Sequence, residues 1–292
     1  MYMLPEFEYH RPASLDEAVR LLSELGPGAR VIAGGTDLVV KMRAGLVSPR
    51  HVVDVTRLSE IRFIRDEGDS LRIGAATTLW EIENSEDVAK GVPVLREAVR
   101  EMASWHVKTT ATIGGNLCNA SPAADTAPPL IVHGARLRIA GPGGFREVGV
   151  EEFFTGPGQT VLQVGELLAE VIVSKIRPGQ GAAFQKLTVR EGALSIVSAA
   201  ALVELSGGVV RDVKVALGAV APTPIRARRV EEALRGRPAS REAIRQASRE
   251  AKADARPITD VRGSREYREE MSVVLVRRAL ERAVERAGGA LT

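Results

Sequence analysis

The chain has 292 residues, of which 45% are hydrophobic and 26% charged, and its formal net charge is +3. This length suggests two or three compact units, each able to bury a core. No apolar run approaches the roughly 20 residues that a membrane-spanning helix needs. The stretch MYMLPEFEYHRPAS lacks the order of a signal peptide, so we expect no membrane insertion and a cytoplasmic location.

Charge pattern and aromatic content argue against a nucleic-acid partner. Basic residues after Arg226 are interleaved with glutamate, as in RRVEEALRGR, which is typical of solvated helix faces with i,i+4 pairs. Aromatic residues make up only 4% of the chain, too few for a base-stacking surface.

The single cysteine, Cys118, limits the redox chemistry of the chain. One thiol forms no intramolecular disulfide, and an iron–sulfur cluster held by this chain alone would need about four. Any such cluster is therefore expected on a partner. His106 and Cys118 lack a third ligand nearby in sequence, so the pair predicts neither a metal site nor a nucleophile with its base.

Residues 1–57 predict a small α/β unit. Ser14 and Glu17 have the spacing of a capping box, and the periodic stretch LDEAVRLLSEL predicts a helix from about 14 to 25 that stops at GPG. ARVIAGG then has the pattern of a buried strand that runs into glycine. HVVDVT has the pattern of a second strand.

Residues 58–176 and 177–292 are predicted to form two further units, which makes the fold class α+β. In the first of these, LRIGAATTLWEIE indicates a strand entering a helix, and VPVLREAVREMASW (92–105) has a helical period. LRIA and REVGV flank GPGG, which indicates a hairpin, and ELLAEVIV indicates another strand. After RPGQG, Gly207-Gly208 separates two strand patterns, and SREYREEMSVVLVRRALERAVERA predicts a long helix.

Two glycine pairs carry the functional hypothesis. The first lies in AGGTDL, directly after a predicted strand, and the second in TIGGN, far along the chain. Adjacent glycines let the backbone approach a ligand and point consecutive N–H groups at one anion. Two such loops suit a ligand with two phosphates. Neither has the Rossmann or P-loop spacing.

The segments AGGTDL and TIGGNLCNASPAADTAPP resemble the FAD-binding medium subunits of molybdenum hydroxylases, the xanthine dehydrogenase and carbon monoxide dehydrogenase group. FEYHRPASLDEAVRLL and ARPITDVRGSREYR are also similar to that family, so the resemblance covers essentially the whole chain. It implies the FAD-binding fold of vanillyl-alcohol oxidase and para-cresol methylhydroxylase. Two α/β subdomains (1–57 and 58–176) would hold FAD beside a smaller α+β C-terminal domain (177–292).

The resemblance implies non-covalent FAD with its pyrophosphate on the two loops. Asp125 matches a cofactor-contacting aspartate, and Leu168 and Lys186 match a leucine and a lysine near the flavin. A lysine there would stabilise the reduced ring. Without the resemblance, Lys186 is equally a strand-surface lysine, Asp125 a turn residue or helix cap, and Leu168 plain core. The implied cofactor-binding residues are Val31, Ile32, Ala33, Gly34, Gly35, Thr36, Asp37, Leu38, Thr112, Ile113, Gly114, Gly115, Asn116, Asp125, Leu168 and Lys186.

The chain also departs from patterns found in the family. It lacks the cysteine-rich insertion of some relatives, and Ser174 stands where a proline is common, which leaves the register of that strand open. The histidines are scattered along the sequence, so a covalent flavin and a metal site are not expected; they are His10, His51, His106 and His133.

Other polar residues receive no catalytic role from the sequence. His51 and Asp54 fall on different sides of a strand with period two. Ser195 and Ser198 lie outside a G-x-S-x-G context, so a hydrolase is not predicted.

The resemblance implies an oxidoreductase subunit that carries electrons. A large molybdenum-cofactor subunit would oxidise the substrate, and [2Fe-2S] clusters on a small subunit would deliver electrons to this FAD. An external acceptor, NAD, a quinone or oxygen, would then take them. No catalytic residue, metal ligand or pocket for the organic substrate is expected in this chain.

Two other functions remain open at this point. One is a stand-alone flavin reductase of the same fold, similar to the enolpyruvyl-glucosamine reductases, which would need a general acid. The other is a scaffold subunit that has lost FAD.

Overall fold

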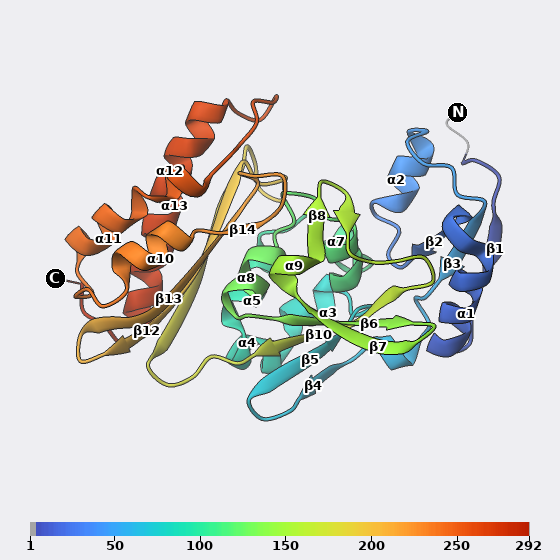
Figure 1. Ribbon diagram of the computed structural model, residues 1–292, viewed down its shortest axis with the longest axis horizontal. Coiled ribbons are helices and arrows are strands. Elements are labelled where there is room, and N and C mark those ends of the chain that lie inside the picture. Colours follow the sequence, from blue (N-terminus) through green and yellow to red (C-terminus); the bar gives the residue numbers. More distant parts are fainter. Residues whose placement is uncertain (1–3, 292) are drawn as a thin grey trace.

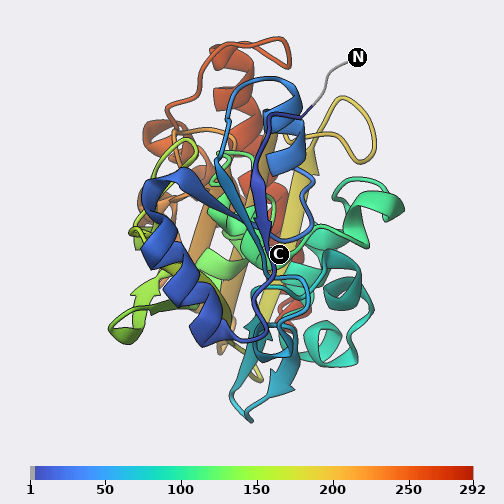
Figure 2. The ribbon, with the colours of Figure 1, turned by 90° about the vertical axis from the view of Figure 1, so that its right-hand side faces the viewer.

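The computed structural model describes residues 4–291, which fold into an α+β arrangement around three main sheets. The sheets follow one another along the chain, from the N-terminal unit at the right of Figure 1 through a central unit to a helix-covered sheet at the left. Figure 2 looks from the N-terminal side, with the first helix and strands in front. Among the described residues, no helix is long and apolar enough to cross a membrane.

The first sheet is parallel, with the strand order β1-β3-β2, and helix α1 packs on one face. Ser14 caps α1 as predicted, because its hydroxyl accepts a hydrogen bond from the Glu17 N–H at 3.2 Å. The Glu17 carboxylate accepts from Ala13 N rather than from Ser14 N, so the predicted capping box is only half formed. Strand β1 and helix α2 were not predicted. The elements are β1 (Glu8–His10), α1 (Leu15–Leu25), η1 (Gly26–Gly28), β2 (Ala29–Ile32), α2 (Leu38–Arg43) and β3 (His51–Asp54).

The second sheet is antiparallel, with the order β4-β5-β10-β6-β7. The hairpin predicted around GPGG is confirmed as β6 and β7. Ser174 pairs with Ser70, which settles the register that the sequence left open, and a bulge follows Leu168. The strands are β4 (Ile64–Asp66), β5 (Ser70–Gly74), β6 (Arg136–Gly141), β7 (Gly144–Gly149) and β10 (Leu167–Ser174).

Short helices connect these strands, and one of them is shorter than predicted. The helix expected over residues 92–105 ends at Arg100, because Ala103 adopts the left-handed conformation at φ 44° and a separate helix begins at Trp105. The connecting elements are η2 (Ser59–Ile61), α3 (Leu79–Asn84), α4 (Glu86–Gly91), α5 (Pro93–Arg100), α6 (Trp105–Lys108), α7 (Ile113–Cys118), α8 (Ala127–Val132), α9 (Val150–Phe153) and the hairpin of β8 (Phe154–Gly156) and β9 (Gln159–Thr160).

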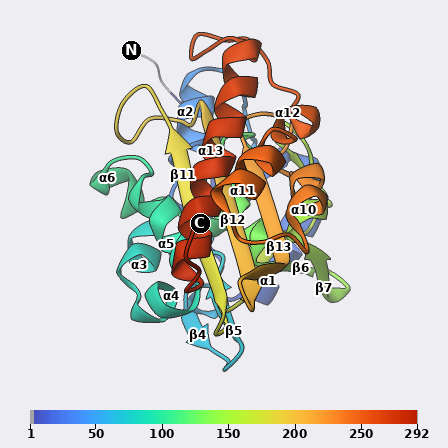
Figure 3. The same cartoon turned by 90° about the vertical axis from the view of Figure 1, so that its left-hand side faces the viewer.

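The third sheet has the antiparallel order β11-β12-β13-β14, and Figure 3 shows α13 lying along β11 and β12. The hairpin at Gly207-Gly208 and the long C-terminal helix are confirmed. A Cβ at Gly181 would lie 2.0 Å from the Ala283 carbonyl oxygen, so only glycine permits this contact between β11 and α13. The elements are β11 (Gln180–Leu187), β12 (Val197–Ser206), β13 (Val209–Gly218), β14 (Ile225–Arg226), α10 (Arg228–Leu234), α11 (Arg241–Ser248), α12 (Ala251–Asp254) and α13 (Arg265–Arg286).

Strand β12 is buried on both faces, which explains its unbroken apolar run. Ala201 and Val203 belong to the core beneath α13, whereas Ala200 and Leu202 belong to the core of the central unit. The third sheet is thus fixed to the central unit through apolar packing. The predicted domain limits near residues 57 and 177 stay predictions.

Candidate functional site

A cleft of about 1080 Å³ is lined by residues of all three sheets and their connections. The structure brings together every cofactor-binding residue predicted from the sequence except Ile113. Ile113 is fully buried in the central core and does not line the cleft. The predicted residues that line it are 31–38, Thr112, Gly114, Gly115, Asn116, Asp125, Leu168 and Lys186.

The first glycine pair forms an open turn between β2 and α2. A Cβ at Gly34 would lie 2.0 Å from the Thr110 carbonyl oxygen, so there is no room for a side chain at this position. Gly35 has φ +68°, a backbone conformation that favours glycine. Within residues 4–291, no acceptor takes the backbone N–H groups of residues 34–37. Consecutive free N–H groups in a turn make a concavity that suits an anion.

The second glycine pair is not a loop, contrary to the prediction, but the first turn of α7. Thr112 caps this helix, and its hydroxyl accepts from Gly115 N at 3.0 Å. Gly114 N donates to the Ala75 carbonyl at 2.9 Å, and a Cβ at Gly114 would lie 2.6 Å from the Ala75 Cβ. The two glycine pairs therefore differ. The first offers backbone N–H groups without an acceptor among the described residues, whereas the second lets the backbone of α7 pack closely against Ala75.

A buried ion pair lies at the end of the cleft formed by β11. Lys186 Nζ donates to Asp125 Oδ2 at 2.7 Å, and the side chains are 1% and 5% exposed. The ammonium also donates to the Glu101 carbonyl oxygen at 3.1 Å, and the Ser195 hydroxyl donates to Asp125 Oδ1. Asp125 and Glu101 belong to the central unit, whereas Lys186 lies on β11 and Ser195 in the loop that follows β11. The network therefore joins the central unit to the third sheet.

Burial dominates the acid–base properties near this pair. It raises the pKa of Asp125 above its ordinary value, and the Lys186 ammonium and the Ser195 hydroxyl oppose the increase. Burial likewise raises the pKa of the Glu101 carboxyl, against the attraction of Lys186. An ammonium bound this tightly to a carboxylate presents little net charge to the cleft.

A second polar network in the lining of the cleft joins α2 to the end of α7, and the sequence did not reveal it. Lys41 Nζ donates to Asn119 Oδ1 at 2.6 Å, and Asn119 Nδ2 donates to Asp37 Oδ1 at 3.1 Å. All three residues line the cleft. The signal available was weak, because Lys41 stands four positions after Asp37 and Asn119 lies just beyond the second glycine pair.

The remaining residues considered from the sequence fall into different surroundings. Leu168 is 4% exposed and lines the cleft from β10. Burial raises the pKa of the Cys118 thiol to about 12, so Cys118 is no nucleophile, and His106 is exposed on α6. Ser195 serves Asp125 rather than a hydrolytic site.

Comparison with known proteins identifies the family of the chain. Residues 5–175 match the family model described as the FAD binding domain in molybdopterin dehydrogenase, and residues 182–283 match the CO dehydrogenase flavoprotein C-terminal domain. The carbon monoxide dehydrogenase medium chain of Hydrogenophaga pseudoflava is 35% identical, over 96% of this chain and 97% of that protein. The putative xanthine dehydrogenase FAD-binding subunit of Escherichia coli K12 is 33% identical, over 97% and 98%.

Solved structures give the same result. A chain of the crystal structure of Cu,Mo-CO dehydrogenase superposes with a TM-score of 0.94 at 35% identity, covering 97% of this chain and 100% of that one. A chain of quinoline 2-oxidoreductase from Pseudomonas putida 86 gives 0.92 at 31% identity, covering 99% and 100%. The predicted α+β flavoprotein fold with its C-terminal domain is therefore confirmed. This chain belongs to the family of FAD-binding flavoprotein subunits of the molybdenum hydroxylases.

Proposed function

We propose that the chain holds FAD non-covalently in the cleft, with the pyrophosphate against the first glycine turn and the start of α7. The observation that carries this placement is that residues 34–37 line the cleft and that their backbone N–H groups have no acceptor among the described residues. An anionic pyrophosphate supplies the missing acceptors. When bound, FAD supplies a ring that takes up and releases electrons.

The dimensions and lining of the cleft fit such a ligand. Its volume of about 1080 Å³ lies just above the roughly 300–1,000 Å³ usual for ligand pockets, which suits a ligand as large as a dinucleotide. Gly115 adds no side chain to the wall, and a Cβ there would meet only the Thr112 hydroxyl, at 3.0 Å. A backbone wall without side chains allows a bulky ligand to approach closely.

The chain's own residues would position the cofactor and exclude water. Leu168 offers an apolar wall, and Lys41 brings a cation close to the first glycine turn through Asn119 and Asp37. Lys186, compensated by Asp125, would act as a fixed hydrogen-bonding group more than as a free positive charge.

The acidic residues of the cleft support electron transfer over a stand-alone reductase. A reductase needs a carboxyl or similar group free to give a proton to its substrate. Asp125 is paired with Lys186, Glu166 binds Arg146 at 2.7 Å, and Asp37 accepts from Asn119. Asp125 and Glu166 are thus engaged in ion pairs and Asp37 in a hydrogen bond to an amide, which favours the electron-transfer function, in agreement with the family relationship.

The related proteins are medium chains or FAD-binding subunits of larger enzymes, which implies companion subunits. We propose that a large subunit carries the molybdenum cofactor and a small subunit the [2Fe-2S] clusters. Electrons would pass from those clusters to this chain and leave to NAD, a quinone or oxygen. The organic substrate would bind to the molybdenum subunit.

The first test is a visible spectrum of the purified chain before and after acid precipitation. Non-covalent flavin gives bands near roughly 450 nm that move to the supernatant. Colour that stays in the pellet would mean a covalent flavin and contradict the proposal. Protein that is colourless even after incubation with FAD would favour the scaffold function instead.

A further inference from the structure

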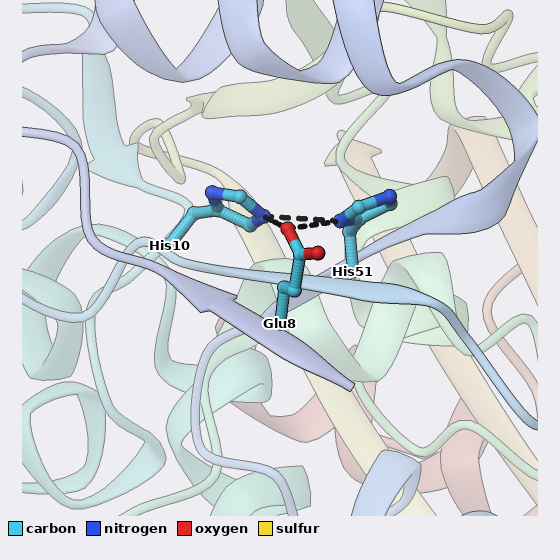
Figure 4. Close-up of side chains that lie close together, drawn as sticks. All are labelled: Glu8, His10 and His51. Carbon is cyan, nitrogen blue, oxygen red and sulfur yellow. Dashed lines mark hydrogen bonds and ion pairs between the residues drawn. The ribbon is translucent and has the colours of Figure 1, made fainter. Parts of the chain in front are cut away.

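Glu8, His10 and His51 form a cluster on the first sheet, and none of the three lines the cleft. Figure 4 shows the two imidazole rings reaching toward each other beside the Glu8 carboxylate. His10 Nε2 lies 3.2 Å from His51 Nδ1, and Glu8 Oε2 lies 3.8 Å from the first nitrogen and 3.4 Å from the second. The histidines are 41 residues apart in the sequence, which therefore predicted no metal site here.

The pairing of β1 with β3 creates this cluster. Glu8 is the register partner of His51, and His10 follows two positions later on the same face of β1. Tyr9 points to the other face, where its hydroxyl donates to Asp54. The three potential ligands are thus held by a regular sheet rather than by a loop.

The distances match the coordination sphere of a small transition-metal ion. The triangle with sides of 3.2, 3.4 and 3.8 Å has a circumscribed circle of radius about 2 Å, and Zn–N and Zn–O bonds are about 2.0–2.2 Å long. An ion near the centre of that circle would contact all three atoms at bonding distance. The rings are tilted by 50° with centroids 5.3 Å apart, so their nitrogens face each other and the rings do not stack.

We propose that Glu8 Oε2, His10 Nε2 and His51 Nδ1 bind one Zn²⁺ ion, which ties the edge strand β1 to β3. Two imidazoles and one carboxylate suit Zn²⁺ better than Mg²⁺ or Ca²⁺, which take oxygen ligands. The Glu8 side chain is 74% exposed, so water can complete the coordination. Because its ligands lie apart from the cleft, the ion would link two strands of the first sheet and take no part in holding the cofactor.

This strand has few other links to its sheet. It is three residues long and lies at the edge, where, among the residues that the structure describes, it pairs with β3 alone and Tyr9 adds a side-chain bond to Asp54. A backbone bond from Glu8 N to the Arg50 carbonyl oxygen, at 2.8 Å, marks the start of the pairing. A metal that binds side chains of both strands adds a cross-link that forms only in the folded state, and so stabilises that state.

The test is zinc binding by the full chain without a histidine tag, first stripped with EDTA and then dialysed against ZnCl2. We expect one Zn²⁺ per chain by metal analysis, with affinity at least tenfold lower in His10→Gln and His51→Gln. His106→Gln is the matched control, because His106 is an exposed histidine on α6, and should bind like the unmodified protein. FAD content, measured in each sample, reports that the variants are folded.

Either of two results would overturn the proposal. One is an unmodified chain that binds no stoichiometric Zn²⁺, which would leave the cluster as a histidine–histidine hydrogen bond. The other is equal zinc affinity in all three variants. Amide hydrogen exchange gives a second readout, since Zn²⁺ should slow exchange in β1 of the unmodified chain and leave β1 of His10→Gln unchanged.

Discussion

Among the cleft glycines without a positive φ, Gly115 is the one at which a new side chain would meet the fewest atoms of the chain itself. A Cβ there has only the Thr112 hydroxyl within 4 Å, whereas Gly34 and Gly114 lie against backbone or Cβ atoms closer than 3 Å. Gly35 is required for its positive φ. Only Gly115, then, separates the effect of a side chain on the ligand from its effect on the fold.

We predict that Gly115→Val lowers FAD affinity at least tenfold, about 1.4 kcal/mol or more, while the apoprotein stays folded. The valine would occupy the wall of the cleft where the ligand has to approach. Fluorescence titration with FAD measures the affinity, and circular dichroism the fold. Cys118→Ser, on the same helix, should bind FAD normally.

Gly114→Ala is the informative contrast. Its methyl group would collide with Ala75, so we expect a loss of stability of about 1–3 kcal/mol from overpacking. A Gly115→Val protein with unmodified FAD affinity would show that this wall does not touch the cofactor.

The buried Asp125–Lys186 ion pair should contribute to the stability of the fold. Removing one member of a buried pair leaves an uncompensated charge, which typically costs about 3–5 kcal/mol. We expect Lys186→Met to lose about this much in urea unfolding. The double variant Asp125→Leu with Lys186→Met should lose clearly less than the sum of the two single changes. If the losses are additive, the two side chains are not energetically coupled and the ion pair does not stabilise the fold.

At the scale of elements, α8 is joined to β10 by a buried histidine. His133 follows α8, and its Nδ1 lies 2.7 Å from the Ser174 carbonyl oxygen, to which it donates. Nε2 has no partner among the described residues. Burial lowers the pKa of His133 to about 4, the Ser174 carbonyl opposes this, and Lys214 lowers it further.

Because of this histidine, we predict that the folded chain loses stability in acid. The unfolded chain binds a proton near pH 6.5 and the folded chain only near pH 4, so stability is full above about 6.5 and falls as the pH drops through this window. The loss is about 3 kcal/mol by pH 4. Urea unfolding from pH 7 to 4 measures it against His133→Asn, which can keep the bond to Ser174. The unmodified chain should lose more stability than the variant, and parallel curves would contradict the assignment.

Several elements were predicted correctly because their signals are local. The Ser14 cap, the two hairpins and the C-terminal helix depend on turn residues or on periodicity within one segment. The errors have tertiary causes. TIGGN looks like a loop because paired glycines disfavour a helix. The segment nevertheless forms α7, in which Thr112 caps the first turn and Gly114 packs closely against Ala75.

At the scale of the whole molecule, the cleft depends on all three sheets. Its lining includes Ile32 from β2, Leu168 from β10 and Lys186 from β11. Strand β12 packs on the cores of both the central and the C-terminal parts, so relative movement of these parts would disturb apolar contacts. A ligand in the cleft should therefore stabilise all three sheets against unfolding.

We predict that FAD at about 100 times its dissociation constant stabilises the chain by about 2.7 kcal/mol. Hydrogen exchange should slow in β2, β10 and β11 alike. Gly115→Val at the same FAD concentration is the control and should be stabilised clearly less, by about 1.4 kcal/mol or below if its affinity is at least tenfold lower. Protection confined to β2 would mean that the cofactor contacts the first unit alone.

The sequence by itself determined the family, the α+β class and the cofactor, because the glycine pairs and helix caps lie in short segments, and all but one of the residues that it predicted to bind the cofactor line the cleft. Only the tertiary structure decided which glycine faces the cleft, which N–H groups stay free, and that Lys186 is neutralised by Asp125, 61 residues away. It alone brought His10 to His51. The physical reason is the same in each case, since these properties depend on which distant segments pack together and on what each polar atom finds there.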